Sequence, residues 1–257
     1  LESIVKVTSC GITDVGMKRA NNEDNYLINP ELNLYVVCDG MGGHVGGEYA
    51  SAIAVNTIEE VLSVIETTPG GEFDVRDGDQ VELNREKVRY SMRLAGRRIY
   101  EKAVSDPEYK GMGTTGLVLL LDGGNAVFGH VGDSRGYLVR GDQIEQITED
   151  HSLVNERVRA GLMSREEAKT HRMRNIITRS LGYQEEVEVD TQVQALQGGD
   201  RFVLCSDGLS NLISTIEIGE VVRRQSSKGA ARELVKMACD RGGDDNITVI
   251  VTHVDSV

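Results

Sequence analysis

The sequence predicts an α+β protein built as a layered α-β-β-α sandwich, in which two antiparallel sheets lie face to face and helices flank them. Short runs rich in Val, Ile, Leu and Tyr recur along the chain, turn sequences separate several of them, and helical spacing appears in two long stretches. A chain of 257 residues, 39% of them apolar, can bury one sizeable core. We therefore expect a single domain that spans residues 1–257.

The strand predictions rest on the short apolar runs, whose β-branched and aromatic residues suit a sheet. These runs cover residues 4–8, 34–38, 117–121, 126–130, 137–140, 187–193, 201–205 and 247–253. Turn sequences at residues 122–125 (Asp-Gly-Gly-Asn) and 141–142 (Gly-Asp) follow two of the runs closely. Because such short connections join strands as hairpins, neighbouring strands should pair antiparallel.

Two long helices are predicted by apolar residues that recur at intervals of three and four positions. The first stripe comprises Ala50, Ile53, Ala54, Ile58, Val61, Leu62 and Ile65, and the second comprises Val88, Met92, Ala95, Ile99 and Ala103. Shorter helices are expected near residues 215–224 and 229–239. One apolar stripe on each long helix is enough to cover the outer face of a sheet. Residues 67–80, rich in Gly and Asp, are interpreted as an exposed loop.

Composition and charge argue against several classes of function. A net charge of -13 would repel a phosphate backbone, so general nucleic-acid binding has little support. No apolar stretch approaches the roughly 18 residues of a membrane span, and residues 1–10 lack the apolar core of a signal peptide. We therefore expect a cytoplasmic monomer that binds neither nucleic acid nor membranes. The cysteines show no C-x-x-C pair and are interpreted as reduced core thiols: Cys10, Cys38, Cys205 and Cys239.

Four aspartates stand where a predicted strand meets a turn. They are Asp39 in Cys-Asp-Gly-Met, Asp133 in Gly-Asp-Ser-Arg, Asp207 in Ser-Asp-Gly and Asp245 in Gly-Asp-Asp-Asn. For any one Asp-Gly pair a plain turn is the commoner explanation. Strand ends can converge on one rim, however, and clustered carboxylates repel one another unless cations compensate. Oxygen ligands without His or Cys suit hard cations such as Mg²⁺ or Mn²⁺, so their joint presence favours a site for two or more divalent ions.

Short motifs follow one another along nearly the whole chain. They are Thr-Asp-Val-Gly-Met-Lys-Arg (13–19), Asn-Glu-Asp (22–24), Val-Cys-Asp-Gly-Met-Gly-Gly-His (37–44), Gly-Met-Gly-Thr-Thr (111–115), Gly-His-Val-Gly-Asp-Ser-Arg (129–135), Ser-Asp-Gly (206–208) and Asp-Asn (245–246). In content and order they resemble the bacterial members of the metal-dependent, type 2C serine/threonine protein phosphatase family. The resemblance implies metal-dependent hydrolysis of phosphoserine and phosphothreonine in proteins, and a Hanks-type serine/threonine kinase as the partner whose action is reversed.

The resemblance also implies a binuclear Mg or Mn centre that Asp39 bridges. By this comparison Asp207 and Asp245 would bind one ion, while the Gly40 carbonyl and Glu23 would lie on the side of the other. A water activated between the two cations would attack the phosphorus, and no phosphoenzyme would be required.

Three further residues receive roles from the same comparison. Asp24 would orient metal-bound water, and Asp133 would join Asp207 in holding a possible third, weaker ion. Arg19 would clamp the substrate phosphate, since its fork of N–H donors matches two phosphate oxygens.

The chain departs from many eukaryotic relatives in one catalytic position. Those relatives carry His directly after the Asp-Gly pair as a proposed general acid, whereas this sequence has Met41 there. His44 follows three residues later, but a residue at a helix start near the site is the simpler interpretation of it. The group that protonates the leaving alcohol therefore stays unassigned.

Residues 148–181 are locally basic within an acidic chain, and the resemblance places a mobile flap here beside the metal centre. The basic residues are His151, Arg157, Arg159, Arg165, Lys169, His171, Arg172 and Arg174. Two interpretations are equally supported. This charge could steer a phosphopeptide, with Arg174 as a substrate contact, or it could belong to the solvated faces of two short helices.

Two rival functions were weighed against a protein phosphatase. A catalytically silent module of the same fold, binding phosphoproteins or sensing ligands, should have lost a metal-binding Asp or the phosphate-binding Arg, yet all are present. An intact cluster of acids would also be costly to keep without metals. Hydrolysis of a small phosphorylated metabolite would use the same chemistry, and only substrate kinetics separates it from the main prediction.

Two phosphate-related motifs in the sequence are set aside. The G-x-G-x-x-G pattern at residues 111–116 precedes an apolar run instead of following a strand, which excludes a dinucleotide site. Asp-Gly-Asp-Gln-Val at residues 77–81 resembles the motif of aspartyl-nucleophile phosphatases but lacks an apolar strand before it. No Cys is followed by Arg six positions later, which excludes a cysteine nucleophile of the phosphatase type.

Overall fold

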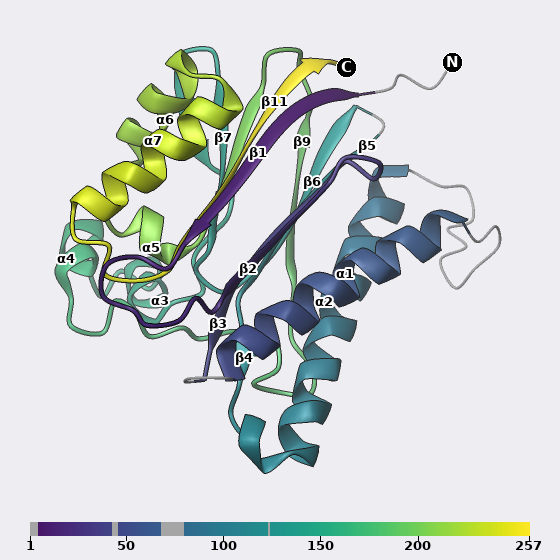
Figure 1. The fold of residues 1–257 in the computed structure, drawn as a ribbon, viewed down its shortest axis with the longest axis vertical. Helices are drawn as coiled ribbons and strands as arrows, with labels where there is room; N and C mark the ends of the chain where they lie inside the picture. Colours follow the sequence, from purple (N-terminus) through teal and green to yellow (C-terminus); the bar gives the residue numbers. More distant parts are fainter. Residues whose placement is uncertain (1–4, 43–45, 68–79, 123) are drawn as a thin grey trace.

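The computed structural model describes residues 5–42, 46–67, 80–122 and 124–257. Two antiparallel sheets pack face to face at its centre, and Figure 1 shows α6 and α7 outside one sheet and α1 and α2 outside the other. This arrangement is the α-β-β-α sandwich that the sequence predicts, so the predicted fold class is confirmed.

One sheet has five strands and joins the two ends of the chain. In spatial order it consists of β1 (Lys6–Asp14), β11 (Ile247–Ser256), β10 (Arg201–Cys205), β7 (Arg135–Arg140) and β8 (Gln143–Gln146). Its outer face is covered by α6 (Thr215–Arg224) and α7 (Ser227–Asp240), with the single turn α5 (Asp207–Ser210) after β10. A capping box between Ser214 and Glu217 fixes the start of α6.

The other sheet has six strands and carries the two long helices. In spatial order it consists of β2 (Asp24–Asn29), β3 (Leu34–Met41), β5 (Gly116–Asp122), β6 (Asn125–Val131) and β9 (Asp190–Ala195), with β4 (Gly113–Thr114) paired to the end of β3. Its outer face is covered by α1 (Gly46–Thr67) and α2 (Gln80–Ser105), followed by the short helix η1 (Pro107–Tyr109).

The continuous apolar runs of the sequence correspond to strands that are buried on both faces. In β3, Val36 packs beneath α1 and α2, while its neighbours Tyr35 and Val37 point into the space between the sheets. Phe128 and Phe202 meet edge to face across that space, with ring centroids 5.8 Å apart. Because alternate residues of a strand point to opposite faces, a strand buried on both faces needs apolar residues throughout.

The structure corrects several predicted boundaries. Strands β2 and β8 were not predicted, because Asp-Asn-Tyr-Leu-Ile-Asn has only three apolar residues and Gln-Ile-Glu-Gln has one, and both strands lie at sheet edges. The strand expected at residues 4–8 runs over Lys6–Asp14, and the one expected at 187–193 is β9. Residues 4 and 68–79, which include most of the predicted exposed loop and of the motif at 77–81, lie outside the described residues.

The cysteine prediction holds only in part. Cys38 and Cys205 are buried core thiols, whereas Cys10 in β1 and Cys239 in α7 are half-buried at the edge of the core. All are free. Within the part of the chain that the structure describes, no helix has both the length and the apolar character that a membrane crossing needs.

Residues 148–181 contain the two short helices that the basic segment suggested, α3 (Leu153–Arg159) and α4 (Arg165–Thr170). At the start of this segment, the N–H of His151 donates to the carbonyl of Gly132 at 2.8 Å. At its end, Thr114 and Leu181 exchange two backbone hydrogen bonds of 3.0 and 2.8 Å. Ser152 and Ile177 form a bridge between the two ends, so the segment leaves and re-enters the sandwich at neighbouring points.

Candidate metal centre

The predicted acidic ligands come together at one end of the sandwich. Asp24 at the start of β2 stands directly opposite Asp39 in the register of β3. Burial raises the pKa of Asp39 well above its usual range, and the charges of Asp24, Asp207, Asp133 and Asp245 raise it further. Residues that lie far apart in the sequence therefore act on one carboxylate.

The backbone of Asp39 is fixed on both sides by hydrogen bonds. Its N–H donates to Thr115 Oγ1 at 2.9 Å, and its carbonyl accepts from the N–H of Thr115 and from Thr114 Oγ1, both at 2.9 Å. Such restraint holds the carboxylate on rigid strand backbone. No local sequence signal marks these threonines as partners of Asp39, because Thr115 lies 76 positions further along the chain.

Gly40 is required by a close backbone contact and not by a turn. It lies inside β3 and its φ is not positive, so the interpretation of Asp39-Gly40 as a turn is wrong. A Cβ on Gly40 would stand 2.1 Å from the carbonyl oxygen of Gly47, and a Cβ on Gly47 would stand 1.9 Å from Glu23 Oε2. The two glycines thus let Glu23 lie close to the backbone of Gly40 and Gly47.

The same rule explains the second Asp-Gly pair. Asp207 and Gly208 form the first turn of α5, again without a positive φ. A Cβ on Gly208 would stand 2.1 Å from the carbonyl oxygen of Asn246, next to Asp245. Gly208 therefore allows the segments that carry Asp207 and Asp245 to touch.

Asp24 is almost fully buried and is held by neutral donors. Its Oδ2 accepts hydrogen bonds from Thr248 Oγ1 at 2.6 Å and from Ser206 Oγ at 2.8 Å. Its Oδ1 is buried and has no hydrogen-bond partner among the described residues. Burial raises the pKa of Asp24 to about 7, an effect that the two hydroxyl donors oppose. The sequence motifs did not identify either hydroxyl as a partner.

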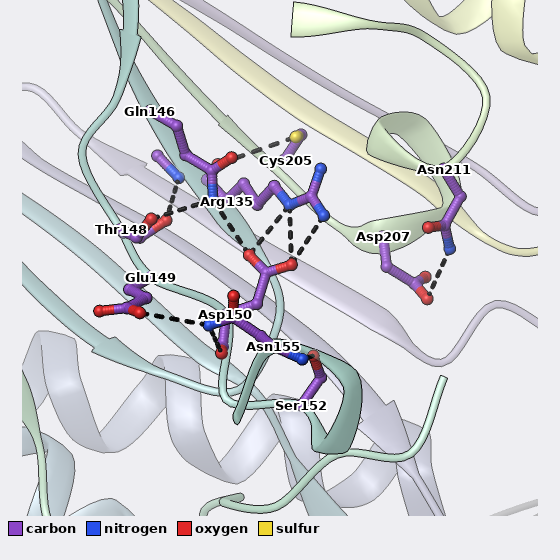
Figure 2. A network of polar contacts seen from close by, with 11 residues as sticks. Arg135, Gln146, Thr148, Glu149, Asp150, Ser152, Asn155, Cys205, Asp207 and Asn211 are labelled. Atoms are coloured by element: carbon purple, nitrogen blue, oxygen red, sulfur yellow. Dashed lines mark hydrogen bonds and ion pairs between the residues drawn. The ribbon is translucent and has the colours of Figure 1, made fainter. Parts of the chain in front are cut away.

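Asp133 and Asp207 repeat this pattern on the neighbouring side. Asp133 is only 7% exposed, its Oδ1 is buried without a partner in the described part of the chain, and burial raises its pKa to about 8. Burial also raises the pKa of Asp207, and the charge of Asp245 adds to this effect. Asn211 Nδ2 donates to Asp207 Oδ2 at 3.1 Å, as Figure 2 shows.

Arg19 lies at the exposed edge of the carboxylate cluster. Its Nη2 donates to Asp245 Oδ2 at 2.6 Å, so the predicted phosphate-binding residue contacts a predicted metal ligand. Asn246 fixes this edge from behind, because its Oδ1 accepts from the N–H of Glu23 and its Nδ2 donates to the carbonyls of Val15 and Asn21.

A second arginine connects the centre to the basic segment. Arg135 Nε and Nη2 donate to the carboxylate of Asp150 at 2.9 and 2.7 Å, and Gln146 Nε2 donates to the same carboxylate at 3.0 Å (Figure 2). The backbone carbonyl of Asp150 in turn accepts from Asn155 Nδ2 at 2.8 Å. This network anchors the start of the segment beside Asp207, and no role for Arg135 was predicted.

The donor chemistry of the site fits a divalent cation. Within the described ranges no three His, Cys, Asp or Glu side chains stand close enough together to enclose an ion as they are placed. The candidate ligands nevertheless form a set with a single kind of donor atom. Its ligands are oxygens only, and two buried oxygens, Asp24 Oδ1 and Asp133 Oδ1, lack partners there. Such a set suits Mg²⁺ or Mn²⁺.

Not every predicted site residue can be placed. His44 lies outside the described residues, and Met41 ends β3 at the position where eukaryotic relatives carry their His. Arg174 is exposed in the basic segment, and its guanidinium contacts no acid in the described part of the chain.

Comparison with known proteins gives a consistent family. Residues 11–247 match the family described as Protein phosphatase 2C. The chain is 38% identical over 248 residues to "Protein phosphatase PhpP" of Streptococcus pneumoniae, which covers 95% of this chain and 96% of that protein.

Solved structures agree over the whole length. The chain resembles the Mycobacterium tuberculosis serine/threonine phosphatase PstP/Ppp with a TM-score of 0.86 and 33% identity, covering 98% of this chain and 100% of that one. It also resembles the catalytic domain of serine threonine protein phosphatase PstP in complex with two manganese ions, with a TM-score of 0.82, 33% identity and coverage of 96% and 97%.

The carboxyl pKa values predict how pH affects the metal-free protein. Folded Asp24 and Asp133, with pKa values of about 7 and about 8, still hold protons that unfolded aspartates release near pH 4. The folded state thus binds more protons than the unfolded state, and the free energy of unfolding should fall as pH rises from about 6.5 to about 8 and level off above that range. Below about pH 6.5, His130 and His151 oppose this trend, because both have lowered pKa values.

Urea unfolding of the metal-free protein across this pH range measures the effect. Saturating Mn²⁺ should remove the decline, since the bound cation displaces the protons. A free energy of unfolding that stays flat or rises between about pH 6.5 and about pH 8 without metal would contradict the burial of these carboxyls.

A single methyl group at Gly208 should separate Asp207 from Asp245. Gly208→Ala forces its Cβ against the Asn246 carbonyl, whereas Gly198→Ala is a matched control with nothing within 4 Å of its Cβ. We expect the first change to lower the free energy of unfolding by about 1–3 kcal/mol and the second by less than about 0.5 kcal/mol, measured by urea unfolding. Equal stability of the two variants would show that the backbone at Gly208 yields freely.

Proposed function

The chain belongs to the protein phosphatase 2C family, and on this premise we propose that it hydrolyses phosphoserine and phosphothreonine in proteins with the help of two Mg²⁺ or Mn²⁺ ions. The observation that carries the proposal is the cluster of mutually repelling carboxylates around Asp39, of which Asp24 and Asp133 are buried, with the guanidinium of Arg19 at its exposed edge. Hydrolysis of a phosphate monoester needs cations that neutralise the phosphate charge, and this site offers oxygen ligands for the cations and an exposed guanidinium for the ester.

The metal ligands of the proposal are those that the family resemblance suggests. Asp39 would contact both ions, Asp207 and Asp245 would hold one, and the Gly40 carbonyl with Glu23 would lie beside the other. Bound there, the cations would lower the pKa of a bridging water and neutralise charge on the phosphoryl oxygens. Support comes from the all-oxygen donor set and from the related PstP structure that contains two manganese ions.

A third, weaker ion is part of the proposal. Asp133 would hold this ion together with Asp207. Burial is the main cause of the raised pKa of Asp133, and the charge of Asp207 is the second. The buried Oδ1 of Asp133, unpartnered among the described residues, supports this assignment.

The chain's own residues bind the ester and orient the water. Arg19 presents two N–H donors to two phosphate oxygens, and its contact with Asp245 keeps the guanidinium at the site before substrate arrives. Asp24 turns one oxygen toward Ser206 and Thr248, which leaves Oδ1 to accept a hydrogen bond from the attacking water. Met41 has no proton to donate, so it cannot be the acid that protonates the leaving alcohol. We assign that role to no other described side chain.

Neither rival function is favoured by an observation on the molecule. A silent binding module would have lost part of the centre, whereas Arg19, Asp39, Asp207 and Asp245 are all in place around one carboxylate cluster. A small phosphorylated metabolite would need a site that encloses it, and the exposed Arg19 edge suits a phosphate on a larger surface.

The proposal extends to the domain organisation, location and partner of the enzyme. We take residues 1–257 as one domain with a flap at about 148–181, working as a cytoplasmic monomer that opposes a Hanks-type kinase. Free thiols agree with a reducing compartment, and the kinase follows from the family resemblance. Light scattering on the purified protein would test the monomer.

Hydrolysis of a phosphothreonine peptide tests the central claim. Activity with Mn²⁺ should vanish in EDTA, and Asp39→Asn should lower kcat/KM at least about 100-fold, because a ligand of the centre loses its charge. Asp244→Asn is a matched control, since Asp244 is exposed on the same loop as Asp245 and pairs only with Lys18 in the described structure. Activity that survives both EDTA and Asp39→Asn would end the proposal.

The basic segment should affect substrate choice more than chemistry. Arg174→Ala is expected to reduce kcat/KM severalfold on an acidic phosphopeptide while leaving a small aryl phosphate nearly unchanged, because the exposed guanidinium acts on the peptide through its charge. Arg232→Ala, on the exposed side of α7, is the matched control. Equal losses on the two substrates would favour the interpretation of these residues as solvated helix faces that support the fold.

A further inference from the structure

Two buried hydroxyl groups join the segments that carry Asp39 and Asp133. Thr115 Oγ1 lies 2.7 Å from Ser134 Oγ, and both residues are fully buried. Thr115 precedes β5, whereas Ser134 directly follows Asp133 in the loop between β6 and β7. Because a hydrogen bond inside the protein is shielded from competing water, this pair can hold two segments in a fixed relation.

Thr115 is at the same time the main backbone partner of Asp39. Its Oγ1 accepts the N–H of Asp39 and its N–H donates to the carbonyl of Asp39, each at 2.9 Å. With its oxygen accepting from Asp39, the hydroxyl proton of Thr115 remains available for Ser134. The Thr115 side chain therefore bonds both to the backbone of Asp39 and to Ser134, the residue next to Asp133.

The methyl group of Thr115 lies close to Gly132, the residue that precedes Asp133. Gly132 has a φ of +109°, and a Cβ there would stand 2.6 Å from Thr115 Cγ2. Gly132 is also bonded to His151, since its N–H donates to His151 Nδ1 at 3.1 Å. Thr115 thus touches both neighbours of Asp133, Gly132 through its methyl group and Ser134 through its hydroxyl.

We propose that Thr115 is a positioning residue that, through Ser134, sets the spacing between the Asp39 and Asp133 carboxylates and thereby the affinity for the weaker ion. The inference rests on the proposed function, because it takes Asp133 as a ligand of that ion. Ion affinity depends steeply on where charged oxygens are held, and hydrogen-bonded neighbours of metal ligands commonly change affinity by about 10–100-fold.

Variants of the pair separate the two parts of this role. Ser134→Ala removes the link to the Asp133 loop but keeps the bond from the Asp39 N–H to Thr115 Oγ1. Thr115→Val keeps the methyl contact with Gly132 and removes both hydroxyl bonds, whereas Thr115→Ser keeps the hydroxyl bonds and removes the methyl group. Ser91→Ala is a matched control, because Ser91 is a fully buried hydroxyl of α2 that bonds only to the Val88 carbonyl among the described residues.

Calorimetric titration of each metal-free variant with Mn²⁺ tests the proposal, and its melting temperature without metal shows whether it folds. Ser134→Ala should weaken the low-affinity step about 10–100-fold and change the tight steps by less than about threefold. Thr115→Val should weaken the low-affinity step at least as much, Thr115→Ser should stay near wild type, and Ser91→Ala should match wild type.

The proposal would be overturned if Ser134→Ala weakened all Mn²⁺-binding steps equally, or if it weakened none of them. It would also be overturned if Thr115→Ser weakened the low-affinity step as much as Thr115→Val does. If Ser134→Ala does not fold, the rates of phosphopeptide hydrolysis by Thr115→Val and Thr115→Ser are measured against Mn²⁺ concentration instead. A positioning role raises the Mn²⁺ concentration for half-maximal rate in Thr115→Val and leaves it unchanged in Thr115→Ser. Failure of the proposed function is distinguishable, because wild-type protein would then show neither Mn²⁺ binding nor Mn²⁺-dependent hydrolysis.

Discussion

Mutual repulsion among clustered carboxylates is the constraint on which the rest of this structure depends. Asp39 is half-buried within reach of the charges of Asp24, Asp133, Asp207 and Asp245, and its desolvation already disfavours the charged form. Folding brings these groups together because strand ends meet at one edge of the sandwich: Asp39 lies near the end of β3 and Asp207 follows β10, whereas Asp24 begins β2 and Asp245 precedes β11. The chain therefore stores an electrostatic cost at one end of the sandwich that divalent cations can relieve, which couples metal binding to stability.

The groups that hold the carboxylates are mostly neutral. Thr248 and Ser206 donate to Asp24, Asn211 donates to Asp207, and Thr115 fixes the backbone of Asp39. Neutral donors determine position without cancelling charge, so the negative charge remains available for cations. Among the described residues around the cluster, arginine pairs with acids only at its margins, with Asp245 on the exposed edge and with Asp150 at the start of the segment 148–181. Neutral hydrogen-bond donors therefore position the carboxylates, and their negative charge is left for the cations to neutralise.

The sequence predicted the two-sheet core and the gathering of the four aspartates, because both leave local signals. A strand buried on both faces has a continuous apolar run, and an Asp at the end of such a run is expected at the edge of the sheet. Edge strands β2 and β8 were not predicted because they contain few apolar residues. The reason for Gly208 and the role of Thr115 escaped as well. A close approach to Asn246 and a hydrogen bond across 76 positions exist only after the chain has folded.

The attachment of the flap has a consequence for how such a protein can diversify. Its two ends are fixed to the sandwich at neighbouring points, through Gly132 and His151 on one side and Thr114 and Leu181 on the other, and Ser152 bridges to Ile177 between them. The residues between these points form an almost closed loop. Such a loop can be lengthened, shortened or exchanged during evolution while the anchored ends keep the ligand-bearing segments in register. Under the proposed role of this segment in substrate choice, recognition can change during evolution while the chemistry and the scaffold stay the same.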